Sequence, residues 1–459
     1  MGKRCYICTC FLSVLNENLK MKKISFTVTL LLVTLMAQAG GLLTNTNQHI
    51  SFLRMMARGA SHEIDAIYTN PAGVAWMDEG WTLSLNIQSA FQTRNVEASF
   101  PLFGTEPKLY KGDAAAPVLP SIYAAYRKDR WAVQGFIGVI GGGGKCSFDS
   151  GLPVFDSKVM AGIMAQTGGT VTPDMYTINS AVKGRQYIFG GQFGFSYRFN
   201  DHFSGHAGFR MNYFNGNQWG YVEALLNANN QPLIDMRLDC DQSGWGITPI
   251  LGLNYRYKGL TLAAKYEFKT NLNIENDTKE LVDPAGALAD FKHGVNTPSD
   301  IPAMLAVAAG YEFTPRLRAT LEYHYFDDKN AEMAHMEGSE VGKQKALKHG
   351  THEFLAGVEF DINKTFTVSA GAQRTDYGLS DDYQSNTSFS CDSYSVGLGG
   401  AINLSSHVKI NVGYFWTMYS DYTKNVPAGN PGYNGTTMPG QDIYSRTNKV
   451  FGMGIDYKF

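Results

Sequence analysis

The sequence contains little charge and almost no long hydrophobic runs. Only 17% of its 459 residues are charged, against about 25% in an average soluble protein. Apart from one apolar run near the N-terminus, and with a mean hydropathy of −0.20, the chain lacks the segments that a bundle of membrane helices needs. The net charge is only −2, which argues against a protein that binds nucleic acid by neutralising phosphates.

Glycine and aromatic residues are abundant instead, with 49 Gly, 25 Tyr and 27 Phe. The glycines have no three-residue period, which excludes a collagen-like chain, and the hydrophobic content of 44% excludes a disordered one. The composition therefore favours a β-rich protein, and it is compatible with one that lies in a membrane.

The N-terminal region has the pattern of a secretory signal peptide. Two lysines begin an apolar stretch that runs to Met36 and is followed by the small-residue cleavage site Ala37-Gln38-Ala39. We therefore expect translation to start at Met21, residues 1–39 to be an upstream extension plus signal peptide, and the rest of the chain to be exported.

The cysteines do not form a recognisable metal site. Three of the six precede the expected start, and their C-x-x-C-x-C pattern from Cys5 has no second ligand cluster. The exported part keeps Cys146, Cys240 and Cys391, whose odd number leaves the pairing of a single disulfide open. We predict neither a metal nor another cofactor.

Catalytic signatures are also absent from the sequence. It contains no His-Glu-x-x-His, no Gly-x-Ser-x-Gly and no dinucleotide fingerprint. Residues 138–146 depart from a phosphate-binding loop, because Val139 replaces the first glycine and Cys146 stands where Ser or Thr would bind magnesium. We predict that the protein is not an enzyme.

From Trp81 onward, apolar and polar residues alternate with the period of two that is typical of strands with two different faces. Most of these segments are about 10–14 residues long, which exceeds the usual ~5–6-residue strand of a soluble protein and matches the ~9–11 residues of a strand that crosses a bilayer. Fourteen segments can be counted, near residues 81–91, 119–127, 130–140, 186–199, 202–214, 247–257, 260–270, 302–313, 316–326, 352–362, 365–375, 393–404, 407–418 and 448–459.

The connections between the segments alternate between short and long. Six are two-residue turns, and seven are polar loops of about 16 to 45 residues, among them 141–185 and 214–246. Short turns on one side and long loops on the other are typical of bacterial outer-membrane barrels. The fold class that we predict is all-β, a fourteen-stranded antiparallel transmembrane β-barrel with both termini in the periplasm.

The two faces of the segments favour this barrel over a soluble β-sandwich. No Asp, Glu, Lys or Arg lies on the apolar parity, where a Lys or Arg facing mid-membrane lipid would cost about 2–4 kcal/mol. The opposite parity, which would face the lumen, carries the charges: Arg210, Lys265, Glu267, Arg318, Glu322, Glu353, Glu359 and Asp361.

Residues 40–80 do not alternate and contain a series of short motifs. Arg58-Gly59-Ala60 is followed by Asp65-Ala66 and then by Asn70-Pro71-Ala72-Gly73, directly before the first segment. Taken alone, the last motif would be an ordinary turn. Placed before fourteen strands, the series resembles the FadL-like family of long-chain fatty acid outer-membrane transporters, which also includes aromatic-hydrocarbon transporters.

This resemblance covers nearly the whole exported chain. It implies an N-terminal hatch (plug) of residues 40–80 inside a barrel of residues 81–459, in the bacterial outer membrane. It also implies that the barrel-assembly machinery recognises the C-terminal Phe459, and that the protein is a monomer in outer-membrane lipid. The net charge of −2 predicts that it has no nucleic-acid partner. The hatch motif residues would be Arg58, Asp65, Asn70, Pro71, Ala72 and Gly73.

The third segment breaks the rule that lumen-facing positions are polar. Both parities are apolar from Trp131 to Ile140, and glycines continue to Gly144; strand glycines mark bulges or bends. In the resembled family this strand bends inward and opens a side window, which makes Gly135, Phe136, Gly138 and Ile140 a candidate lateral gate. A strand packed against an apolar hatch would have the same composition, and the sequence leaves both interpretations open.

We therefore expect passive uptake of a hydrophobic compound, in the first place a long-chain fatty acid, with lateral release through a kink in the third strand. Arg210, Lys265 and Arg318 are candidates for the substrate carboxylate, because their parity directs them into the lumen. A general diffusion porin and a surface adhesin are the alternatives. The sequence does not distinguish a fatty acid from an aromatic hydrocarbon.

Overall fold

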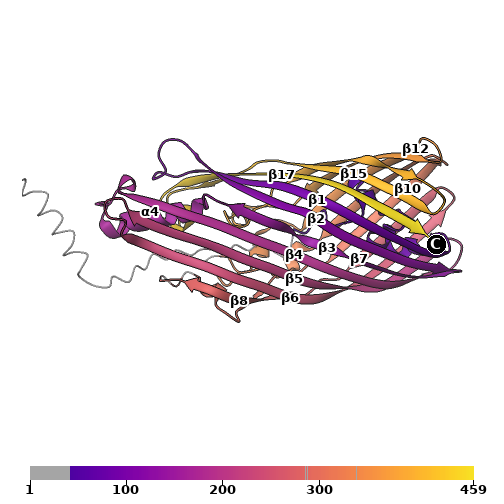
Figure 1. Cartoon of the computed structure of the whole chain (residues 1–459), viewed down its shortest axis with the longest axis horizontal. Helices are drawn as coiled ribbons and strands as arrows, with labels where there is room; N and C mark the ends of the chain where they lie inside the picture. Colours follow the sequence, from indigo (N-terminus) through magenta and orange to yellow (C-terminus); the bar gives the residue numbers. More distant parts are fainter. Residues whose placement is uncertain (1–41, 285, 287, 337–338) are drawn as a thin grey trace, which may run out of the picture.

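The computed structural model describes residues 42–284, 286, 288–336 and 339–459. The predicted upstream extension and signal peptide, and the cysteines before Met21, lie outside these residues. The described strands form one wall (Figure 1): β1 (Gly80–Ser99), β2 (Lys108–Lys128), β3 (Trp131–Phe148), β4 (Tyr176–Arg198), β5 (Phe203–Leu226), β6 (Pro232–Tyr257), β7 (Leu260–Glu267), β8 (Asn273–Val282), β9 (Asn296–Pro298), β10 (Met304–Thr314), β11 (Leu317–Phe326), β12 (Thr351–Asp361), β13 (Phe366–Asp376), β14 (Ser393–Asn403), β15 (Val408–Tyr419), β16 (Tyr422–Val426) and β17 (Gly440–Lys458).

The wall closes on itself, because β1 pairs with both β2 and β17. Every pair is antiparallel, and fourteen strands complete the circle: β1–β7, β10–β15 and β17. Strands β8 and β16 extend the wall by pairing with the upper parts of β6 and β17. The predicted fourteen-stranded barrel is confirmed, and each predicted segment corresponds to one of its strands.

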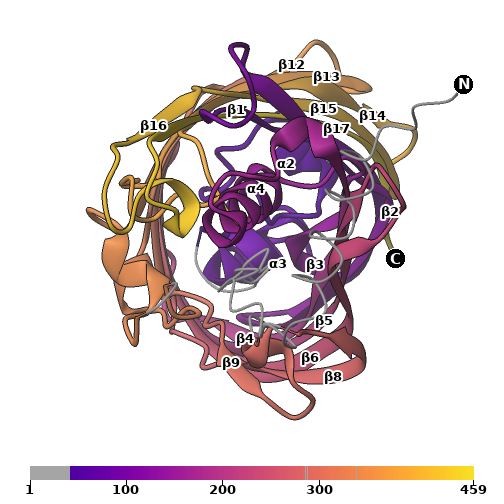
Figure 2. The ribbon, with the colours of Figure 1, turned by 90° about the vertical axis from the view of Figure 1, so that its left-hand side faces the viewer.

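Short helices accompany the wall. They are α2 (Ile50–Arg54), α3 (Ala66–Thr69), η1 (Pro71–Trp76), α4 (Pro153–Thr167), η2 (Pro173–Met175), η3 (Ala289–Phe291), η4 (Asp328–Asn330), η5 (Lys343–Ala346) and η6 (Tyr433–Gly435). Within the described ranges, no helix is long and apolar enough to cross a membrane. Figure 2 looks along the barrel and shows α2, α3 and α4 inside the ring of strands.

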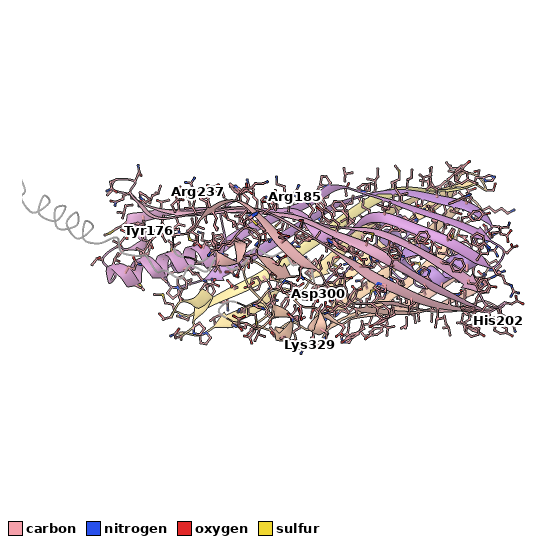
Figure 3. The ribbon with its side chains drawn as sticks, turned by 90° about the horizontal axis from the view of Figure 1, so that it is seen from below. Tyr176, Arg185, His202, Arg237, Asp300 and Lys329 are labelled. Atoms are coloured by element: carbon pink, nitrogen blue, oxygen red, sulfur yellow. The ribbon has the colours of Figure 1, made fainter. Side chains whose placement is uncertain are left out.

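One side of the barrel is much taller than the other. Strands β4, β5 and β6 have 23, 24 and 26 residues, whereas β10–β15 have 10 to 12. In Figure 3, Tyr176 lies toward one end and His202 at the other, while Lys329, just after β11, lies between them. The expectation that residues 141–185 and 214–246 are long loops is therefore wrong, since most of them belong to β3, α4, β4, β5 and β6.

The tall part of the wall has its polar face outside. Outward positions of β4 and β6 are apolar at Phe189 and Trp245. They become charged at Arg185 and Asp241, which lie closer to the end of the barrel where Tyr176 is located, here called the upper end (Figure 3). The inward face there packs around α4 in a buried apolar cluster that includes Phe155. The outward apolar surface is therefore confined to the lower part of these strands, and α4 lies inside the barrel above that level.

The segment before β1, residues 42–79, lies inside the barrel and is named the plug here. Its helix α2 contacts β13, β14, β15, β17 and β1, and η1 contacts strands β2 to β7. The plug thus crosses the lumen from one side of the wall to the other. The three described cysteines, Cys146, Cys240 and Cys391, are not joined by disulfides.

Candidate functional site

The ladder between β2 and β3 is interrupted partway along the wall. Residues 113–115 pair with residues 145–147, and the pairing resumes only at Ile122 and Ile137. Residues 116–121 of β2 and 138–144 of β3 therefore face each other without pairing, and we term them the β2–β3 gap.

The sequence explains the interruption on both strands. Pro117 and Pro120 lack the N–H groups that a ladder needs. On the other strand, Gly142 and Gly144 have φ angles of 95° and 72°, in the left-handed region that favours glycine. The gap is thus a consequence of local residue types, which prevent both strands from continuing a regular pairing.

The four predicted gate residues lie at this gap or next to it. Gly135 and Phe136 belong to the last paired stretch, whereas Gly138 and Ile140 lie in the gap. Phe136 points inward, with its ring 5.3 Å from that of Tyr68 in the plug. β3 therefore packs on an apolar plug surface, as one of the two interpretations expected, and its pairing with β2 is interrupted beside these residues. Its action as a gate stays a prediction.

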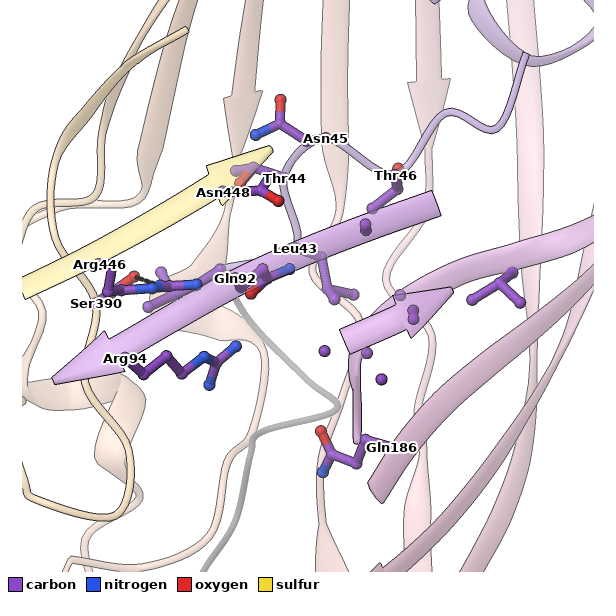
Figure 4. Close-up of a pocket in the computed structure, with 18 of the residues that line it drawn as sticks. Leu43, Thr44, Asn45, Thr46, Gln92, Arg94, Gln186, Ser390, Arg446 and Asn448 are labelled. Carbon is purple, nitrogen blue, oxygen red and sulfur yellow. Dashed lines mark hydrogen bonds between the residues drawn. The ribbon is translucent and has the colours of Figure 1, made fainter. Parts of the chain in front are cut away.

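A cavity of about 200 Å³ lies inside the barrel behind the gap (Figure 4). Apolar residues from the gap and from strands beside it line one side, among them Ala116, Leu119, Val139, Tyr187 and Val450. The polar lining comes mainly from β1, β4 and β17 (Gln92, Arg94, Gln186, Arg446 and Asn448) and from the plug (Thr44, Asn45, Thr46 and Gln48). A larger cavity of about 840 Å³ at the outer end adjoins it, because both are lined by Tyr383 and Ser388. The two cavities thus lie next to each other, one at the outer end and one behind the gap.

Two arginines in this cavity were missed by the sequence analysis. Arg94 of β1 and Arg446 of β17 are directly opposite each other in the antiparallel ladder. Their side chains extend in the same direction in Figure 4. The predicted strands ended at residue 91 and began at residue 448, so neither arginine was assigned to a face. Continuing the parity of Gln88 to Arg94 would have placed it in the lumen.

Arg210 and Lys265, two of the predicted carboxylate ligands, come together on another side of the lumen, at a cavity of about 70 Å³. Both contact the buried carboxylate of Glu267: Arg210 forms an ion pair with it, and Lys265 Nζ lies 2.8 Å from its Oε1. Lys265 also donates to the backbone oxygen of Tyr68 in the plug at 2.8 Å. These two cations therefore already share one carboxylate of the barrel.

Arg318, the third predicted ligand, lies apart from them. It donates to Glu359 Oε1 and to Asp361 Oδ2, each at 2.8 Å, and lines a cavity of about 670 Å³ that also touches the short turns. The structure thus brings together Arg210 and Lys265 but not Arg318. Their role toward a substrate carboxylate stays a prediction, and an incoming acid would have to compete with the carboxylates already bound to them.

The predicted hatch motif is bound by polar side chains of β3, β4, β5 and β6. The hydrogen bonds run from Gln134 Nε2 and Ser196 Oγ to the oxygen of Pro71 (both 2.8 Å), from Ser204 Oγ to the oxygen of Ala72 (2.7 Å), and from Asn70 Nδ2 to Asn254 Oδ1 (2.8 Å). A Cβ at Gly73 would lie only 2.6 Å from the backbone oxygen of Ser61, so close packing requires glycine there. The motif is therefore a docking point between plug and wall.

Arg58 and Asp65, the other two motif residues, form an ion pair inside the plug. Arg58 Nε donates to Asp65 Oδ2 at 2.6 Å and its Nη2 donates to Oδ1 at 3.0 Å, which is the strong two-point geometry. Asp65 is fully buried. Nearby, Arg54 of α2 forms an ion pair with Glu359 of β12. Ion pairs thus fix the fold of the plug and attach it to the wall.

Comparisons with known proteins agree with this architecture. A family model described as an outer membrane protein beta-barrel domain matches residues 273–459. The chain is similar in structure to a FadL homologue of Pseudomonas aeruginosa, with a TM-score of 0.66 and 14% identity over 92% of this chain and 100% of that one. No curated protein sequence matches this chain.

Two transporters of aromatic compounds are also similar in structure. The toluene transporter TodX of Pseudomonas putida has a TM-score of 0.55 and 14% identity, over 86% of this chain and 94% of that one. The toluene transporter TbuX of Ralstonia pickettii has a TM-score of 0.51 and 16% identity, over the same shares of 86% and 94%. At such low identities the likeness establishes the fold. The chain has the β-barrel fold of the FadL homologue and the toluene transporters, as the sequence predicted, and its residues 273–459 match the outer membrane protein beta-barrel domain.

Proposed function

We propose that this protein takes up hydrophobic compounds across the outer membrane and releases them sideways, through the β2–β3 gap, into the membrane. Long-chain fatty acids are the substrate class that we propose. The observation that carries the proposal is the interrupted ladder with a cavity directly behind it. The solved structures with this fold support it, since they include a FadL homologue and toluene transporters.

A sideways route suits an apolar molecule, because the direct route to the periplasm passes the plug. The plug is attached to the wall by ion pairs and hydrogen bonds, such as those of Arg54 and Asn70. An alkyl chain moving through that network would separate charges and leave buried polar groups without partners. Next to the gap, by contrast, apolar side chains such as Leu119 and Val139 line the cavity, and apolar burial contributes about 25 cal/mol per Å².

Transport in this account needs no energy source. A molecule enters the outer cavity at the mouth, moves to the inner cavity and leaves into lipid, driven by its own gradient. The narrow step is the gap, where Ile140 packs against the plug, as does Phe136 in the paired stretch next to it. We propose that the plug acts as a hatch, and that a shift of the plug away from β3 opens this step.

The double substitution Gly135→Val with Gly138→Val tests the sideways route. A Cβ at Gly138 would lie 2.8 Å from the Phe136 ring and 2.9 Å from Ser121 Cβ on the opposite side of the gap, so valine narrows the opening. Uptake of a labelled long-chain fatty acid by cells that carry the variant should fall well below wild type at equal surface amounts.

Gly191→Val is the matched control, because no atom lies within 4 Å of a Cβ there. This glycine is on the neighbouring strand β4, paired with Ile137, and the control should keep wild-type uptake. Unchanged uptake in the double variant would refute lateral release. High conductance for hydrophilic solutes, insensitive to removal of the plug, would instead favour a general diffusion porin.

A further inference from the structure

Arg94 and Arg446 place two positive charges next to each other in the inner cavity. They are cross-strand partners, and like charges directly opposite each other destabilise a strand pair. Both line the cavity behind the β2–β3 gap. The wall therefore carries an unfavourable arrangement at the site where a transported molecule would pass.

Neither arginine has a counter-charge in the part of the chain that the structure describes. Arg446 donates to Ser390 Oγ at 3.3 Å and lies 4.8 Å from the centre of the Tyr419 ring, and both of these partners are neutral. The Nε atoms of both arginines are buried without a hydrogen-bond partner. Four other arginines of the plug and lumen each contact a carboxylate: Arg54, Arg58, Arg210 and Arg318.

Two amide side chains and an apolar wall complete the surroundings. The amides of Gln92 and Asn448 line the same cavity, and each has a buried oxygen without a hydrogen-bond partner. On the gap side the cavity is lined by Ala116, Leu119 and Val139. One cavity thus combines a cationic, hydrogen-bonding end with an apolar side that leads to the gap.

We propose that Arg94 and Arg446 together bind the carboxylate of an amphiphilic acid whose alkyl chain lies along the gap side of the cavity. The carboxylate supplies the counter-charge that both guanidinium groups lack, and its oxygens accept hydrogen bonds from both of them. The pair then selects acids over neutral hydrocarbons. This inference rests on the proposed uptake of hydrophobic compounds and names the group that the site recognises.

Binding to the purified full-length protein tests the inference, with hexadecanoic acid and hexadecanol as probes. At a pH where the acid is ionised, the wild type should bind the acid at least about tenfold more tightly than the alcohol, because hydrogen bonds to charged groups are the stronger ones. In the double variant Arg94→Gln with Arg446→Gln this preference should disappear while the affinity for the alcohol stays the same. Replacing both arginines by lysine should retain part of the preference.

Arg237→Gln is the matched control, since Arg237 lies exposed on the outer face of β6 and pairs with Asp235. It should leave both affinities unchanged, and heat-dependent migration in gels should show that all variants are folded. Equal affinities for acid and alcohol in the wild type, or a preference that survives the glutamine double variant, would overturn the anion site.

The same probes distinguish failure of this inference from failure of the proposed function. Binding and cellular uptake of hexadecanol without any preference for the acid would overturn the carboxylate site and leave hydrophobic uptake standing. If neither compound is bound or taken up, the proposed function fails and the anion site fails with it.

Discussion

Replacing Asp65 by asparagine tests whether a buried ion pair holds the plug together. The Asp65 carboxylate accepts from Arg58 at 2.6 and 3.0 Å and from Ser61 Oγ at 2.8 Å, and it is fully buried. Asparagine keeps the size of the side chain but removes its charge. Arg58 then retains only Glu63 at 3.1 Å and the more distant Glu359 at 3.7 Å as acidic partners.

Removing one partner of a buried ion pair typically costs about 3–5 kcal/mol. Because Glu63 and Glu359 still offset part of the Arg58 charge, we expect the lower end, about 3 kcal/mol. The loss falls on the plug, since the ion pair lies within residues 58–65. The wall is held by its own strand ladders. A loss of this size raises the population of the opened plug by about a hundredfold or more.

Native-state hydrogen exchange measures this opening. Amides of α3, of η1 and of Asn70 between them, whose N–H donates to the oxygen of Ala66, should exchange about a hundredfold faster in Asp65→Asn than in wild type. Amides of the barrel strands should be unaffected. Asp78→Asn is the control, because the Asp78–Lys458 pair is exposed and exposed pairs contribute about 0–1 kcal/mol. Equal exchange in the two variants, or equally faster exchange in the barrel strands, would refute the reasoning.

Two further predictions concern single positions. Gly73→Ala should destabilise the plug by about 1–3 kcal/mol, since its Cβ would lie 2.6 Å from the backbone oxygen of Ser61. Gly429→Ala is the control, because the nearest atom to its Cβ is 3.7 Å away. Hydrogen exchange of plug amides should become faster in the Gly73 variant and stay unchanged in the Gly429 variant. The second position is Lys343, the first residue of η5. Its burial and the nearby Lys424 lower its pKa to about 7. Its rate of acylation should therefore level off above neutral pH, whereas a rate that keeps rising to alkaline pH would show an ordinary lysine.

The barrel could be predicted because lipid imposes a period of two on each strand that it contacts. The same reason explains what was missed. Above Phe189 and Trp245 the outward positions no longer face lipid, and the polar residues there resemble those of a loop. Arg94 and Arg446 belong to this part of the wall, so strands that ended with the apolar pattern excluded them.

The alternation of residues along a strand predicts which side chains point into the lumen, but it does not predict their partners there. It correctly directed Arg210, Lys265 and Arg318 inward, but it does not tell which side chains of other strands they meet. The partners of Arg210 and Arg318, Glu267 and Glu359, come from β7 and β12, and only the register and curvature of the wall bring them into contact. A free cation can therefore be recognised only once its neighbours are known.

Only one of the two strands that form the β2–β3 gap was recognised as irregular from the sequence. The glycines from Gly141 to Gly144 indicated a bend in β3, while Pro117 and Pro120, on the strand beside it, were not used. Prolines on one strand and glycines on its neighbour together predict a broken ladder. That these segments face each other follows only from the pairing of β2 with β3.

Uptake by intact cells tests the central claim most directly. Cells with and without this protein are given a labelled long-chain fatty acid and a labelled small hydrophilic solute, and the initial rates of both are measured. The account predicts that the protein raises the rate for the acid and leaves that for the hydrophilic solute unchanged. A raised rate for the hydrophilic solute without any gain for the acid would contradict it.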